Sequence, residues 1–103
     1  MTVKEIFENQ IAARAPKATD IDAVFFFNIT GDDGGQWVVD LTDGGKVYEG
    51  KADNADCSIT IDAGDFKDLV SGAVPGAALF MQQKLSIAGN MGLALKLGEL
   101  VGG

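Results

Sequence analysis

Residues 57–70 decide the fold, and they read Cys-Ser-Ile-Thr-Ile-Asp-Ala-Gly-Asp-Phe-Lys-Asp-Leu-Val. The first six residues alternate apolar and polar side chains, and this period of two predicts a β-strand over 57–62 with one buried face. After the strand the period changes, because Phe66, Leu69 and Val70 recur three and four positions apart, which is typical of a helix. A strand is therefore followed directly by a short helix, which is expected to end at Ser71-Gly72.

Upstream of this stretch, alternation predicts three more strands, over 21–30, 36–42 and 46–49. Two connections rich in Gly and Asp separate them: Gly31-Asp32-Asp33-Gly34-Gly35 and Asp43-Gly44-Gly45. They predict tight turns, because glycine adopts a positive φ at little cost. Residues 25–27 are all phenylalanine, so alternation leaves open which face of the first strand is buried.

The N-terminal segment, residues 3–14, is predicted to form a helix with Thr2 as its N-cap and Glu5 completing a capping box. Pro16 is expected to end it. Its apolar positions have helical spacing: Val3, Ile6, Phe7 and Ile11. Packing of this face on the sheet is the simpler interpretation. Contact with a membrane surface is the alternative, because basic residues flank both ends of the helix.

Downstream, Pro75 is expected to begin another short helix, residues 85–87 form a brief strand, and Gly89-Asn90 caps a final helix. The final helix carries two apolar stripes: Leu93, Leu97, Leu100 and Val101 on one side, and Met91 and Leu95 on the other. A helix of this kind needs cover on both sides. A partner, a membrane or a bound apolar ligand could supply it. The order of elements predicts one α+β domain over 1–103 with the helices on one face of a sheet.

Composition excludes several functional classes. The 103-residue chain has no histidine, which removes Ser-His-Asp and Cys-His catalysis. A net charge of −7 with scattered basic residues argues against nucleic-acid binding. Cys57 is expected to be a small buried hydrophobe, and the aspartates lack the spacing of a calcium loop, so no metal or cofactor is expected. Without a signal peptide or a membrane-spanning run, a cytoplasmic location is expected.

Several ordered fragments resemble the sterol carrier protein-2 family. Fragments within residues 56–97 carry most of the resemblance, and the most specific is Gly89-Asn90-Met91-Gly92-Leu93-Ala94-Leu95-Lys96-Leu97. Upstream, 27–29 and 35–41 are similar to two further landmarks of the family. The resemblance implies a five-stranded mixed, mainly antiparallel sheet, with helices on one face enclosing an apolar tunnel. It also implies non-enzymatic binding and transfer of fatty acids, acyl-CoA, sterols or phospholipids.

Two features depart from the family pattern. Gln83 stands where family members often have glycine, and its side chain would either narrow the tunnel or point to solvent. The chain ends Leu100-Val101-Gly102-Gly103 rather than in a Ser-Lys-Leu-type peroxisomal signal, which favours the cytoplasm.

The predicted ligand site lies between the sheet and the helical layer. Eight residues are expected to line it: Phe25, Phe66, Leu69, Leu79, Met81, Gln83, Met91 and Leu95. Arg14 or Lys84 is a candidate partner for a carboxylate or phosphate head group. We expect a monomer that contacts membranes transiently. The alternative is an interaction module whose C-terminal helix docks on another protein or on a second copy, which would give a concentration-dependent mass.

Overall fold

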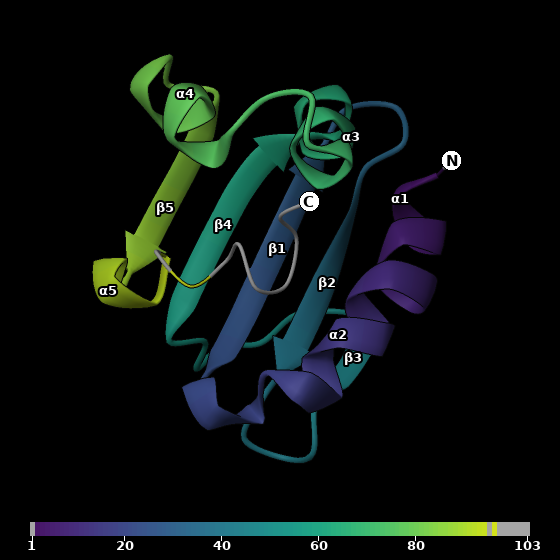
Figure 1. Ribbon diagram of the computed structural model, residues 1–103, viewed down its shortest axis with the longest axis vertical. Helices are drawn as coiled ribbons and strands as arrows, with labels where there is room; N and C mark the ends of the chain where they lie inside the picture. Colours follow the sequence, from purple (N-terminus) through teal and green to yellow (C-terminus); the bar gives the residue numbers. More distant parts are fainter. Residues whose placement is uncertain (1, 95, 97–103) are drawn as a thin grey trace.

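The structure is a computed structural model, which describes residues 2–94 and 96. These residues form one sheet with helices on one face (Figure 1). Its strands are β1 (Val24–Thr30), β2 (Gly35–Asp40), β3 (Lys46–Glu49), β4 (Cys57–Asp62) and β5 (Leu85–Gly89). Their order is β3-β2-β1-β4-β5; β1 and β4 are parallel and all other neighbours antiparallel. The prediction of a five-stranded, mainly antiparallel sheet is confirmed.

The N-terminal helix is continuous through α1 (Val3–Glu5), the π-helical η1 (Ile6–Ile11) and α2 (Ala12–Arg14). Its capping box is present, because Thr2 Oγ1 accepts a hydrogen bond from the Glu5 amide and the Glu5 carboxylate accepts one from the Thr2 amide. These bonds to Thr2 also lower the pKa of Glu5.

The segment after the N-terminal helix contains two 3₁₀ turns, η2 (Ala15–Lys17) and η3 (Thr19–Ile21). The prediction that the first strand begins at Ile21 is therefore wrong. Ile21 ends a turn, and Asp22 takes a left-handed φ of 52° that a strand cannot include.

The remaining helices follow their local signals. In α3 (Ala63–Ser71) the Asp62 side chain accepts from the Gly64 amide, and Gly72 ends the helix at a φ of 83°. Helix α4 (Gly76–Met81) follows Pro75. In α5 (Met91–Ala94) the Asn90 side chain accepts from the Gly92 amide. The predicted stripe residues beyond Ala94 lie outside the described residues.

The core lies between the sheet and the helices. On β1, Phe25 and Phe27 are buried on this inner face, whereas Phe26 is half-buried on the other, which answers the question that alternation left open. Cys57 is buried as predicted, and burial raises the pKa of its thiol.

An aromatic cluster joins the N-terminal helix and α3 to the sheet. The Phe7 ring stacks on Trp37 and Phe66 at centroid distances of 4.9 and 5.2 Å, and meets Phe27 edge-on at 5.3 Å. All four side chains are buried. These rings hold the two helices in a fixed relation to the strands.

Candidate functional site

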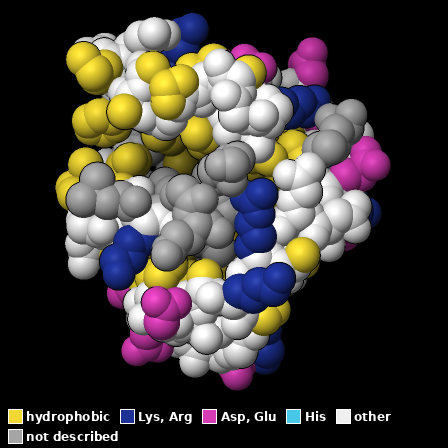
Figure 2. Space-filling model, viewed as in Figure 1, with side chains coloured by type: hydrophobic (Ala, Val, Ile, Leu, Met, Phe, Trp, Pro, Cys, Tyr) yellow, Lys and Arg dark blue, Asp and Glu magenta, His cyan; other side chains and the backbone are white. Residues whose placement is uncertain are grey.

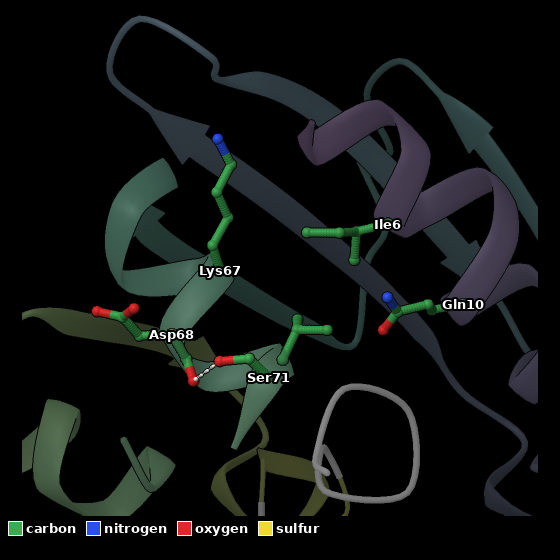
Figure 3. A pocket seen from close by; sticks show the side chains of 6 residues that line it. Ile6, Gln10, Lys67, Asp68 and Ser71 are labelled. Atoms are coloured by element: carbon green, nitrogen blue, oxygen red, sulfur yellow. Dashed lines mark hydrogen bonds between the residues drawn. The ribbon is translucent and has the colours of Figure 1, made fainter. Parts of the chain in front are cut away.

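A cavity of about 310 Å³ lies between the N-terminal helix and α3 (Figure 3). Six of the described residues line it: Ile6, Gln10, Lys67, Asp68, Val70 and Ser71. Its volume is at the lower end of the range of about 300–1,000 Å³ typical of small-molecule sites. The cavity can therefore accept a slender ligand.

Helical spacing brings these side chains together. Ile6 and Gln10 are four residues apart and extend from the N-terminal helix toward α3 (Figure 3). Lys67, Val70 and Ser71 are three and four apart, so α3 presents them on one face. The cavity is thus a space between two helix faces.

The cavity has an apolar floor and a polar rim. Ile6 and Val70 are almost fully buried, while Gln10, Lys67 and Ser71 retain more contact with solvent. The Ser71 hydroxyl donates to the Asp68 carbonyl oxygen at 3.1 Å, which keeps this hydroxyl close to α3. An apolar chain with one polar end matches this arrangement.

The lining residue Lys67 forms an ion pair with Asp33. The Lys67 Nζ lies 2.8 Å from Asp33 Oδ2, and the same oxygen accepts a hydrogen bond from the Val3 amide at 3.1 Å. The Asp33 carboxylate thereby links the loop between β1 and β2 to both helices. Lys67, and then the Val3 amide, lower the pKa of Asp33.

The eight residues predicted to line a tunnel fall into two groups. Phe25, Phe66 and Leu79 are buried in the core and Leu69 is partly buried, but none of them lines the described cavity. Of the other four, three lie at the surface and one lies outside the described residues. The existence of an enclosed tunnel stays a prediction.

Met81, Gln83 and Met91 lie at the surface of the described structure, and Met81 is 82% exposed. The six-residue helix α4 directs Leu79 inward and Met81 outward. Gln83 has a left-handed φ of 61°, and its side chain lies in solvent. Leu95 lies outside the described residues. A direct ligand role for these residues stays a prediction.

The residues of the cavity lining were not predicted as a site. Their spacing within each helix was visible in the sequence, but nothing local shows that the two helix faces stand apart. Of the predicted head-group cations, Arg14 is half-buried in α2 and Lys84 is exposed between α4 and β5, so neither lines this cavity. Lys67 is the cation that does.

Residues 2–94 and 96 contain no group of three or more His, Cys, Asp or Glu side chains placed to hold a metal ion. Within the same residues, no helix has both the length and the apolar character needed to cross a membrane.

The sequence profile of the SCP-2 sterol transfer family matches residues 3–102. The chain belongs to this family. The resemblance noted in the sequence is thereby confirmed, and the five-stranded α+β fold agrees with solved SCP-2 structures.

Two curated relatives illustrate the family match. The chain is 38% identical over 98 residues to hydroxysteroid dehydrogenase-like protein 2 of Homo sapiens, covering 93% of this chain and 23% of the relative. It is 42% identical over 84 residues to sterol carrier protein 2 of Homo sapiens, covering 78% of this chain and 15% of the relative. The SCP-2 chain thus spans less than a quarter of the length of these relatives.

Two solved structures share the fold over nearly their whole length. The crystal structure of sterol carrier protein 2 like 2 from Aedes aegypti has a TM-score of 0.78 and 28% identity, covering 95% of both chains. The solution structure of palmitated SCP2L2 from the same organism has a TM-score of 0.80 and 28% identity, covering 98% of this chain and 95% of that one.

Proposed function

We propose that this SCP-2 domain binds a lipid with a long acyl chain and transfers it between membranes without altering it chemically. The observation that carries the proposal is the cavity between the N-terminal helix and α3, with its apolar floor and polar rim. The likeness to a structure of palmitated SCP2L2 supports a fatty acid as the ligand class. A cytoplasmic monomer belongs to the same proposal.

The size and lining of the cavity favour a single acyl chain. Removing each CH₂ group from water contributes about 0.8 kcal/mol, so a sixteen-carbon chain supplies on the order of 10 kcal/mol before the cost of association. A volume of about 310 Å³ suits one chain better than the two chains of a phospholipid. A ligand carboxylate at the rim would meet Lys67, in competition with Asp33.

A binding protein fits the lining better than an enzyme does. The chain has no histidine, and the lysine in the lining is paired with Asp33. The hydroxysteroid dehydrogenase-like relatives extend far beyond the matched region, so their name does not assign a reaction to this domain.

Native mass spectrometry of the purified protein, followed by uptake of palmitate, tests the proposal. We expect a monomer that carries one lipid or takes up one palmitate. S71W adds bulk to the exposed rim of the cavity and should weaken uptake at least tenfold. T60W is the matched control, because Thr60 is exposed on β4 and does not line the cavity. Wild-type protein without uptake, or S71W with normal uptake, would overturn the proposed site.

The alternative function is an interaction module. Its supporting observation is the exposure of three large apolar side chains, Phe80 and Met81 on α4 and Met91 at the start of α5. A clean dimer without lipid in the same mass spectrum would favour this alternative.

A further inference from the structure

The surface formed by α4, β5 and α5 is unusually apolar. Phe80 and Met81 on α4 are 46% and 82% exposed, and Met91 at the start of α5 is 48% exposed. Figure 2 shows hydrophobic side chains gathered over α4 and β5. We call Phe80 and Met81, both on α4, the apolar face. Exposed clusters of this kind commonly mark surfaces that bind a partner or a membrane.

The same surface lacks acidic groups. Residues 69–94 contain a single charged side chain, Lys84, although the whole chain has 15 acidic and 8 basic residues. Lys96 is exposed just beyond this segment. In a protein of net charge −7, this segment carries no negative charge that an anionic bilayer would repel.

Local geometry holds the backbone of Lys84 close to α4. The Lys84 amide donates to the Leu79 carbonyl oxygen at 2.9 Å, and the Gln83 amide donates to that of Phe80 at 3.1 Å. The chain therefore turns tightly after α4, and Lys84 comes three residues after Met81 in the sequence. Apolar residues at the acyl boundary with a lysine near the phosphates are typical of interfacial membrane contacts.

The N-terminal helix, the other membrane-contact candidate in the sequence, does not offer such a face. Its apolar positions are no more than 1% exposed: Val3, Ile6, Phe7 and Ile11. These side chains pack in the core, so this helix could present them to a bilayer only by leaving the sheet.

We propose that the apolar face docks on the surface of a phospholipid bilayer, with Phe80 and Met81 entering the head-group region and Lys84 contacting phosphates. The proposal rests on the proposed lipid transfer, because a carrier has to reach a bilayer to load or release its ligand. The docking surface is distinct from the cavity between the N-terminal helix and α3.

Flotation with large unilamellar vesicles tests this docking. The vesicles contain phosphatidylcholine alone or phosphatidylcholine and phosphatidylserine at four to one. We expect the full chain to bind the mixed vesicles more tightly and to be released by salt, and F80E and M81E each to weaken binding at least tenfold. Y48E is the matched control, because Tyr48 is 45% exposed on the edge strand β3 at the opposite side of the sheet.

Palmitate uptake separates the two proposals. F80E should take up palmitate as the wild type does, because Phe80 is not part of the cavity lining. Wild-type protein that takes up palmitate but leaves both vesicle types unbound would overturn docking alone. Equal vesicle binding by F80E and Y48E would also overturn it. A wild-type dimer that F80E converts to a monomer, without vesicle binding, would show that a second copy covers the face. Absence of palmitate uptake would count against the proposed function instead.

Discussion

Phe7 and Phe80 show how differently two regions of this molecule use the same side chain. Phe7 is fully buried and contacts three other aromatic rings between the N-terminal helix and the sheet. Phe80 is 46% exposed on α4. The first region uses its apolar surface for internal packing, which stabilises the fold. The second leaves apolar surface in contact with water. This surface contributes little to folding stability and is available for binding.

The largest expected effect is therefore in the aromatic cluster. Phe7→Ala should lower the free energy of unfolding by about 3–5 kcal/mol, because it leaves a cavity among three rings. Phe80→Ala should lower it by less than about 1 kcal/mol. Urea titration followed by the fluorescence of Trp37 measures both. Equal losses in the two variants would remove the distinction between the regions.

A smaller effect is expected where the turn between β2 and β3 meets η2, the 3₁₀ turn that follows the N-terminal helix. Gly45 has a φ of 81°, and a Cβ there would lie 2.6 Å from backbone atoms of Ala15 and Pro16. Gly45→Ala should cost about 2–4 kcal/mol, from left-handed strain and the clash together.

Gly44→Ala is the matched control for this contact. Gly44 has a φ of 74° but open space around the added Cβ, so it should show the strain alone, about 1 kcal/mol. Thermal unfolding of the two variants isolates the contribution of the turn contact. A loss in Gly44→Ala as large as that in Gly45→Ala would show that packing against the helix contributes little.

In the exposed region, Gln83→Gly should be mildly stabilising, by about 0.5–1 kcal/mol. Gln83 holds a left-handed φ of 61°, which glycine adopts without strain, and its side chain is exposed. Part of the gain is offset by the greater freedom of glycine in the unfolded chain. Differential scanning calorimetry at neutral pH measures the shift in Tm. A clear loss of stability would mean that the Gln83 side chain makes a contact of its own.

The smallest effect is expected from the interactions of the Asp33 carboxylate with Lys67 and the Val3 amide. Because these two groups lower the pKa of Asp33 in the folded protein, their interactions stabilise the fold above the usual Asp pKa of about 4. The contribution is lost as the pH falls through the lowered value. Asp33→Asn should therefore reduce stability at neutral pH and flatten its decline in acid. Unfolding of both proteins between pH 7 and pH 3 tests this. If the free energy of unfolding depends on pH in the same way in both, the Asp33 interactions contribute nothing.

Local sequence signals predicted most elements accurately. Thr2 and Glu5 form the expected capping box, Gly72 ends α3, and Asn90 caps the start of α5. Each signal acts between neighbours in the chain, so it does not depend on tertiary contacts. The start of the first strand was wrong because Asp22 takes a left-handed conformation that no pattern of alternation reveals.

The site was harder to predict than the fold. Met81 and Met91 look like lining residues when only apolar character is considered, yet both are exposed, and Lys67 gave no signal as a cavity residue. Burial of a side chain depends on which other element lies above it. That information is spread over distant parts of the chain.

The sequence by itself determined the family, the order of helices and strands, and the capping of the N-terminal helix, because spacing and capping are local properties. Only the tertiary structure decided that Phe25 and Phe27 face inward, that Ile6 and Val70 meet across a cavity, and that Phe80 and Met81 remain outside. Each of these depends on how the helices lie over a five-stranded sheet whose neighbouring parallel strands, β1 and β4, pair residues about 30 positions apart in the sequence. Contacts over such distances are set by the packing of the whole domain.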